Sequence, residues 1–135
     1  MSDQVQLVTS SKLPIPAGPY SPGTIAGNLV FVSGQGGRDP STNQLAGPDV
    51  ESQTEQVLKN IAAILEAAGS GLPHVLRCSV FLVDTKEFPR MNEVYGRIFG
   101  RHRPARTTVE VSNLPGAGMR VEIDAIAVIP APVRS

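Results

Sequence analysis

Only two segments of the sequence have the residue spacing of an amphipathic helix, and strand-like segments precede, separate and follow them. In the first, from about Val50 to Ala68, apolar residues recur at steps of three and four and form one stripe. The second begins near Thr85, a possible N-cap, accommodates Pro89 in its first turn and ends at Gly100. Because two helices can cover only one face of a sheet, this pattern restricts the fold strongly.

Turn and cap signals place the other elements. Ser52 and Glu55 have the spacing of a capping box, and Gly69 is a natural end for the first helix. The pair Gly27-Asn28 suits the positive backbone angles of a tight hairpin between two short strands. The strand-like segments are Thr24–Ala26, Leu29–Val32, Cys78–Val83, Thr107–Val111 and Arg120–Val128. The order ββ, α, β, α, ββ predicts an α+β fold with one sheet and two helices on one face.

Several of these strands have apolar residues on both sides. Leu29–Val32 and Val80–Val83 have no polar face, which is typical of a sheet that is covered on both sides. The sequence has no third helix to supply the second layer. We therefore expect another copy of the chain to cover the open face, which predicts a homo-oligomer.

Length and composition exclude several classes of protein. With 135 residues, 41% of them hydrophobic, the chain suits a single domain over residues 1–135. Twelve basic and 12 acidic residues give zero net charge, so no overall field attracts nucleic acid or a membrane, and no apolar run is long enough to span one. Met1–Asp3 begins a polar segment without the features of a secretory signal, and Cys78 is the single cysteine. We expect a cytoplasmic protein.

Common cofactor and nucleophile motifs are missing. His74, His102 and Cys78 do not have metal-ligand spacing, so we expect no metal site. Cys78 lies inside a strand pattern, which favours a buried, inert thiol. The Gly34–Gly37 segment lacks the third glycine of a dinucleotide fingerprint. It is expected to form a sharp turn whose backbone N–H groups could face a small ligand.

Charged residues near the end of the sequence allow two interpretations each. Arg97, Arg101, His102, Arg103 and Arg106 form a basic run, either a solvated helix end or a nucleic-acid patch. Arg106 differs because it follows Pro104-Ala105 and enters a strand, where its planar fork suits a carboxylate.

The roles of Glu122, Asp124 and Tyr20 also allow two interpretations each. Glu122 and Asp124 share one face of the last strand and are either solvent-facing charges or a carboxylate that accepts a proton from water. Tyr20 is either a packing aromatic on a proline-stiffened loop or a hydroxyl directed into a cleft.

Several motifs, in order, resemble the signature of the RidA family, also called YjgF. They are Gly18–Ser21, Phe31–Gln35, the helical segment Asn60–Gly69, Pro104–Val111, Leu114-Pro115 and Val121–Ala127. The match covers about Pro14 to Val128. The resemblance implies a chorismate-mutase-like α+β fold, a variant of the ferredoxin-like fold, assembled as a homotrimer with ligand sites between subunits. It also implies hydrolysis of reactive 2-imino acids, such as 2-iminobutanoate and 2-iminopropanoate, to 2-keto acids and ammonia without a cofactor.

The resemblance also assigns roles to residues. Arg106 matches the arginine that binds the substrate carboxylate, and Glu122 matches the acid that positions or activates the attacking water. Tyr20 matches the tyrosine of the family's Gly-Pro-Tyr loop and is expected to be catalytic together with these two residues. The other expected contacts with substrate are Ser33, Gly34, Asn92 and the backbone at Thr108.

The chain departs from the family pattern at two places. Thr108 stands where many relatives have cysteine, and the Phe99–Pro104 segment is a few residues short, which leaves the substrate range open. Some relatives are described as ribonucleases or translation inhibitors. An RNA-acting protein and a non-catalytic ligand-binding or chaperone-like trimer are therefore the alternatives to the deaminase.

Overall fold

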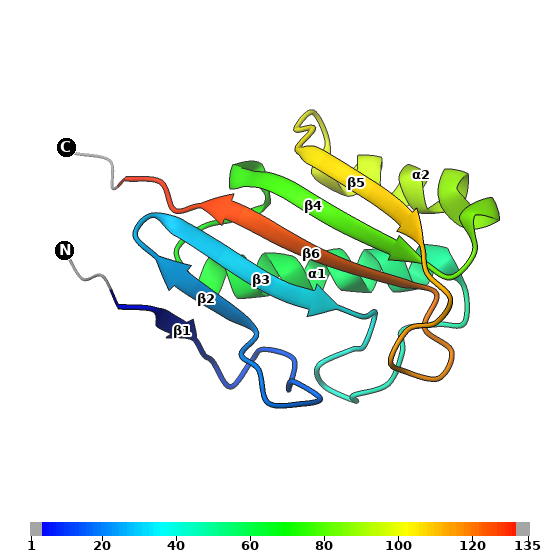
Figure 1. The fold of residues 1–135 in the computed structure, drawn as a ribbon, viewed down its shortest axis with the longest axis horizontal. Coiled ribbons are helices and arrows are strands. Elements are labelled where there is room, and N and C mark those ends of the chain that lie inside the picture. The colour runs from blue at the N-terminus through cyan, green and yellow to red at the C-terminus, as the bar shows by residue number, and fades with distance from the viewer. Residues whose placement is uncertain (1–3, 132–135) are drawn as a thin grey trace.

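The computed structural model describes residues 4–131, which form one six-stranded sheet with two helices on one face (Figure 1). Its strands and α-helices are β1 (Gln6–Val8), β2 (Gly23–Ala26), β3 (Leu29–Gln35), α1 (Val50–Ala67), β4 (Val75–Leu82), α2 (Phe88–Phe99), β5 (Ala105–Glu110) and β6 (Val121–Val128). The strand order is β1-β2-β3-β6-β4-β5, in which β4 and β5 are parallel and the other neighbouring pairs are antiparallel. The predicted α+β architecture is confirmed. The polar start at Met1–Asp3 lies outside the described residues.

The helix ends differ in part from the sequence prediction. The N-cap of α1 is Asp49, whose side chain accepts a hydrogen bond from the Ser52 N–H at 2.9 Å, so the predicted capping box at Ser52 is wrong. Thr85 does not cap α2, because it begins a short 3₁₀ turn that Asp84 caps through the Lys86 N–H. The predicted ends at Gly69 and Gly100 are confirmed, and both residues have positive φ.

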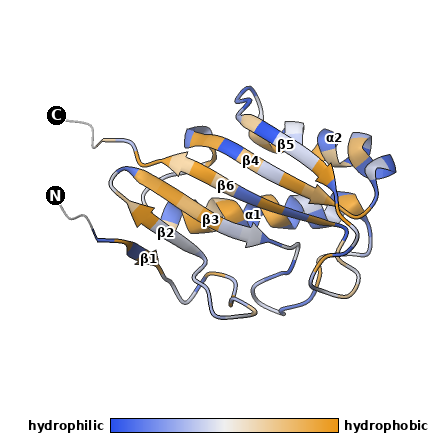
Figure 2. Ribbon diagram, in the orientation of Figure 1, coloured by the Kyte–Doolittle hydropathy of each residue, from blue (hydrophilic) through white to orange (hydrophobic). Residues whose placement is uncertain are grey.

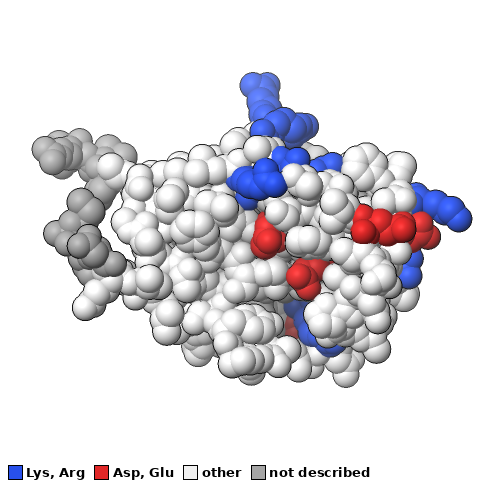
Figure 3. All heavy atoms as spheres, in the orientation of Figure 1, with Lys and Arg blue, Asp and Glu red and all other residues white. Residues whose placement is uncertain are grey.

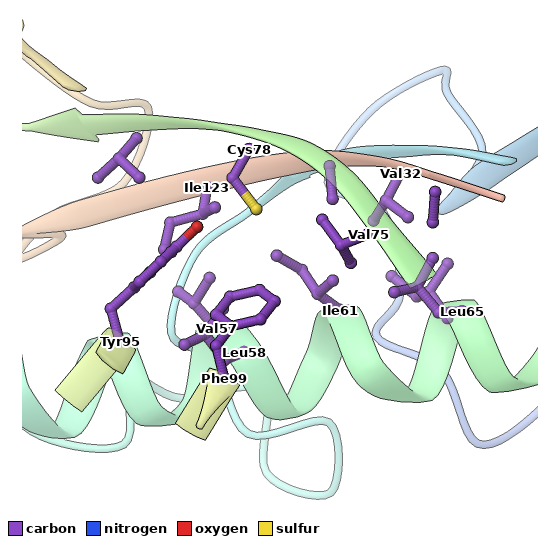
Figure 4. Packing of buried hydrophobic residues seen from close by; sticks show 14 of the residues in the cluster. Val32, Val57, Leu58, Ile61, Leu65, Val75, Cys78, Tyr95, Phe99 and Ile123 are labelled. Carbon is purple, nitrogen blue, oxygen red and sulfur yellow. The ribbon is translucent and has the colours of Figure 1, made fainter. Parts of the chain in front are cut away.

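The hydrophobic core lies between the helices and one face of the sheet (Figure 4). Ile61 and Leu65 of α1 pack with residues of the strands above them, among them Val75 and Ile123, and all four are at most 1% exposed. Cys78 belongs to this core, and its burial raises the pKa of the thiol. A buried thiol with a raised pKa agrees with the inert role expected for Cys78.

The other face of the sheet carries no helix in the described part of the chain and is turned toward the viewer in Figure 1. In Figure 2 β3 is coloured hydrophobic over much of its length, whereas β6 also carries hydrophilic residues, and Phe31 of β3 is 41% exposed. Arg77 of β4 also lies on this face and donates a hydrogen bond to the Thr107 hydroxyl at 2.7 Å. That a second copy covers this face stays a prediction.

Neither α-helix within residues 4–131 is long and apolar enough to cross a membrane.

Candidate functional site

The residues singled out from the sequence form two groups. The first, which we call the Glu122 pocket, is a cavity of about 100 Å³ whose lining includes Tyr20, Gly34, Arg38, Asn60, Met119 and Glu122. The second, which we call the Arg106 cluster, consists of Arg106 and Thr108 on β5 with Phe88, Asn92 and Tyr95 on α2. Each group combines polar side chains with apolar walls, as small-molecule sites commonly do.

Glu122 lies on β6 with its side chain against the backbone of Gly34. A Cβ atom at position 34 would overlap Glu122 Oε2 and lie 2.9 Å from its Cδ, so the close approach requires glycine there. Burial raises the pKa of Glu122, and the negative charge of Asp124 raises it further. The carboxylate is therefore a stronger proton acceptor than a solvated glutamate.

Asp124 differs from Glu122 despite its equivalent place in the strand pattern. Its Oδ1 accepts a hydrogen bond from the Ser79 N–H at 3.0 Å, which ties it to β4. The structure thus separates the two acids that the sequence could not tell apart. Figure 3 shows acidic groups near the middle of the open face, with basic groups both above and below them.

Tyr20 and Ser33 stabilise the loop at the mouth of the pocket. The Tyr20 hydroxyl accepts a hydrogen bond from the Ala17 N–H at 3.3 Å, and the side chain is 50% exposed. The Ser33 hydroxyl donates to the Ser21 carbonyl at 2.6 Å, which joins the end of β3 to the same loop. Tyr20 lines the pocket, so its position agrees with a hydroxyl at a cleft rather than a core aromatic.

Arg106 packs on two aromatic rings. Its guanidinium carbon lies 4.7 Å from the centroid of the Tyr95 ring and 5.5 Å from that of Phe88. Such contacts stabilise a guanidinium while leaving its N–H groups in the plane available for an anion. Tyr95 belongs to the core, whereas Phe88 is 39% exposed at the rim.

Asn92 and Thr108 complete the Arg106 cluster. Asn92 lies between Phe88 and Tyr95 along one face of α2, and its Oδ1 is buried with no hydrogen-bond partner within residues 4–131. A buried acceptor without a partner is costly, so a donor from a ligand or another chain would stabilise it. Thr108 follows Arg106 on the same face of β5 and is half-buried.

Within one chain the two groups face opposite sides of the sheet. Arg106 pairs with Cys78, which is buried beneath the helices, and Glu122 pairs with Phe81. Cys78 and Phe81 are three residues apart on β4, so their side chains point to opposite faces. Arg106 accordingly does not line the Glu122 pocket. One chain therefore does not bring the predicted carboxylate anchor and the predicted base together.

Sequence analysis missed two buried amides that hold the loops of the Glu122 pocket. Gln53 is fully buried; its Nε2 donates to the Gly47 and Gly118 carbonyls at 2.9 Å each, and its Oε1 accepts from the Arg120 N–H. Asn60 is 2% exposed and donates to the Arg38 carbonyl at 2.8 Å. Both belong to the apolar stripe of α1, and a polar residue on that stripe was the available signal.

The basic run makes local contacts at the end of α2. Arg97 forms an ion pair with Glu55 at 3.5 Å, and Arg103 donates to the Gly100 and His102 carbonyls. His102 Nε2 lies 2.7 Å from the Val75 carbonyl oxygen. These contacts favour the solvated helix end over a nucleic-acid patch. Residues 4–131 contain no cluster of three His, Cys, Asp or Glu side chains that could hold a metal ion.

Comparison with known proteins gives consistent matches along the chain. A model of the family described as endoribonuclease L-PSP matches residues 10–129. A RutC family protein of Pyrococcus horikoshii is 47% identical over 122 residues, which are 90% of this chain and 96% of that protein. The human 2-iminobutanoate/2-iminopropanoate deaminase is 37% identical over 123 residues, 91% of this chain and 89% of that protein. The crystal structure of E. coli TdcF with bound serine has a TM-score of 0.85 and 36% identity, covering 91% of this chain and 98% of that one.

Proposed function

Because this chain belongs to the endoribonuclease L-PSP family, also called RidA or YjgF, we propose that it hydrolyses reactive 2-imino acids to 2-keto acids and ammonia. The substrates proposed are 2-iminobutanoate and 2-iminopropanoate, the compounds in the name of the human relative. The observation that carries the proposal is the presence of two complementary half-sites in one chain: a carboxylate with a raised pKa in a pocket, and an arginine packed on aromatic rings.

The proposal includes a homotrimer in which neighbouring copies complete each site. Two observations support it: Arg106 and Glu122 face opposite sides of one sheet, and the face that carries Glu122 exposes apolar side chains such as Phe31 and Val109, with no helix of residues 4–131 over them. If the copies pack through this face, the Arg106 cluster of one copy can meet the Glu122 pocket of the next.

The proposed reaction needs only groups that this chain supplies. Arg106 binds the substrate carboxylate through two N–H groups, while Asn92 and the backbone at Thr108 hold the substrate from the same side. Glu122 accepts a proton from water as its oxygen attacks C2, and we assign Ser33 and Gly34, near the end of β3, to orienting the reactants. Glu122 returns this proton to the nitrogen to give the carbinolamine. The carbon–nitrogen bond then breaks, the hydroxyl proton also passes to nitrogen, and the keto acid and ammonia leave. No cofactor takes part in this scheme.

A coupled assay tests the proposed function. An amino-acid oxidase generates 2-iminobutanoate in solution, and release of the keto acid is followed with and without the protein. We expect acceleration by the wild-type protein and its loss in Arg106→Ala, because the substrate loses its charged anchor. Arg101→Ala changes an exposed arginine outside both groups and is expected to keep full activity. Failure of the wild-type protein to accelerate hydrolysis of this imine would reject the proposed substrates.

The same assay separates the alternatives. A ligand-binding or chaperone-like protein would bind the keto acid without accelerating imine hydrolysis. An RNA-acting protein would bind RNA with a steep dependence on salt that is lost on neutralising Arg101 and Arg103. The ion pair of Arg97 with Glu55 of α1 and the contact of Arg103 with the end of α2 give that alternative less support than the deaminase.

A further inference from the structure

Arg38 is a cation in the wall of the Glu122 pocket that the proposed reaction does not use. It lies in the loop between β3 and α1 and is half-buried. Its Nη1 donates to the Asn43 carbonyl at 3.1 Å, and it forms no ion pair with any carboxylate of residues 4–131. Because burying an unpaired charge is unfavourable, a half-buried arginine in a cavity calls for an anionic partner.

The surrounding loops fix the position of Arg38. Asn60, from the core side of α1, donates to its carbonyl at 2.8 Å, and Arg38 forms a backbone bridge with Leu45. On the other side its Nη2 lies against Gly116, where a Cβ atom would be only 3.2 Å away. The guanidinium is therefore held between two loops, so little conformational entropy is lost when it binds a ligand.

Two acidic residues also line the pocket, and each makes other contacts than an ion pair with Arg38. Asp39 Oδ1 accepts hydrogen bonds from the Ser41 N–H at 2.8 Å and from its hydroxyl at 2.7 Å. Glu122 lies against Gly34 and serves as the proposed base. Arg38 is thus the one cation among the residues that line this pocket, and neither acid pairs with it.

The size of the pocket leaves room beyond the reacting centre. One ordered water needs about 10–15 Å³ of cavity. The volume of about 100 Å³ therefore accommodates the attacking water together with a short substrate side chain. A side chain extending from C2 into this pocket would share it with the guanidinium of Arg38.

We propose that Arg38 is a specificity-determining residue that selects 2-imino acids with a second carboxylate, on the side chain. This inference rests on the proposed deaminase function. Arg106 of one copy would bind the carboxylate next to the imine, and Arg38 would bind the second one. The reaction itself is unchanged: water adds to C2, the carbon–nitrogen bond breaks, and a 2-keto dicarboxylate and ammonia leave.

Paired substrates test the inference. Oxidases acting on aspartate or glutamate supply dicarboxylic imines, and oxidation of 2-aminobutanoate supplies 2-iminobutanoate. We expect kcat/KM to be higher for the dicarboxylic imine. Arg38→Gln should lower that value about tenfold to a hundredfold, as for loss of a charged hydrogen bond, while changing kcat/KM for 2-iminobutanoate less than twofold. Arg38→Lys should restore part of the loss, and Arg101→Gln, the matched control, should change neither substrate.

Failure of the inference and failure of the proposed function give different results. If 2-iminobutanoate is hydrolysed but Arg38→Gln affects both substrates equally or neither, Arg38 does not determine specificity. If neither imine is hydrolysed, the deaminase function itself is wrong.

Binding of the stable keto acids provides a measurement without catalysis. Calorimetry should show tighter binding of 2-oxoglutarate or oxaloacetate than of 2-oxobutanoate, with the difference abolished in Arg38→Gln. Equal affinities in the wild-type protein would overturn the inference.

Discussion

The Glu122 pocket and the Arg106 cluster are held together by different kinds of structure. Loops form most of the pocket, and side-chain amides of Gln53 and Asn60 fix those loops through backbone carbonyls. Regular elements form the cluster, in which a strand residue packs on two rings of a neighbouring helix. The charged groups also differ, since burial raises the pKa of Glu122 in the pocket, whereas Arg106 in the cluster is a permanent cation.

This difference suggests that the two regions have different roles in substrate binding. A guanidinium on a strand beside a helix is held rigidly by regular structure. Such a position suits a residue that binds the carboxylate common to all the proposed substrates. Loops tolerate sequence change, so they suit the part of a site that contacts the substrate side chain, which varies from one 2-imino acid to another. We therefore expect changes in the cluster to affect all substrates and changes in the pocket loops to affect some more than others.

The largest effect is expected at Glu122. Glu122→Gln keeps the shape but removes the proton acceptor, so kcat should fall about 10²- to 10⁴-fold with little change in KM. Gly34→Ala should also lower activity, because a Cβ atom at this position would displace the Glu122 side chain. Steady-state kinetics with 2-iminobutanoate measure both. An unchanged kcat in Glu122→Gln would show that the pocket does not contain the base.

Gln53 should affect stability and the pocket together. Gln53→Leu leaves the Arg120 N–H and two loop carbonyls without partners, so the free energy of unfolding should fall by about 1–3 kcal/mol. Urea denaturation measures this loss. Lys59→Gln changes an exposed residue of the same helix and should be neutral. Comparable stability of the two variants would mean that the amide does not hold the loops.

A smaller effect is expected from the rim of the Arg106 cluster. Phe88→Leu removes one aromatic face beneath the guanidinium, and KM should rise about two- to fivefold at unchanged kcat. Phe88→Tyr retains the face and should behave like the wild type. Because Phe88 is 39% exposed, neither change should alter the melting temperature greatly. A fall in kcat with unchanged KM would contradict a role in positioning the anchor.

The smallest effect concerns pH. The role proposed for Glu122 requires an ionised carboxylate, so kcat/KM should fall as pH decreases through its pKa, which burial and Asp124 raise above the usual value. Asp124→Asn removes the neighbouring negative charge, so the fall in kcat/KM on acidification should occur at lower pH. A pH–rate profile of both proteins measures the shift, and a shift toward higher pH would contradict the assigned cause.

Periodicity predicted most of the fold, and local ambiguity explains the errors. The stripe of α1, the hairpin at Gly27 and the helix ends at Gly69 and Gly100 follow from residue spacing and backbone preference. The three-residue strand Gln6–Val8 was missed because its pairing with β2, rather than its own pattern, defines it. Asp49 and Ser52 are both good capping residues, and only the backbone angles decide between them.

The candidate site was predictable by residue type but not by arrangement. Arg106 and Glu122 were found from their motifs, yet the face that each occupies depends on the register of β4 with β5 and β6, which the sequence does not contain. Arg38 had no motif at all, because its importance comes from the cavity that it lines.

Complementation between two inactive variants tests the central claim most directly. Arg106→Ala and Glu122→Gln chains would be unfolded together and refolded as mixed oligomers, with each variant refolded alone as the control. If a site takes Arg106 from one copy and Glu122 from another, about a quarter of the sites in an equal mixture would have both residues, and activity should return to about that level. Activity no higher than that of either variant alone, in oligomers shown to be mixed, would contradict a site shared between copies.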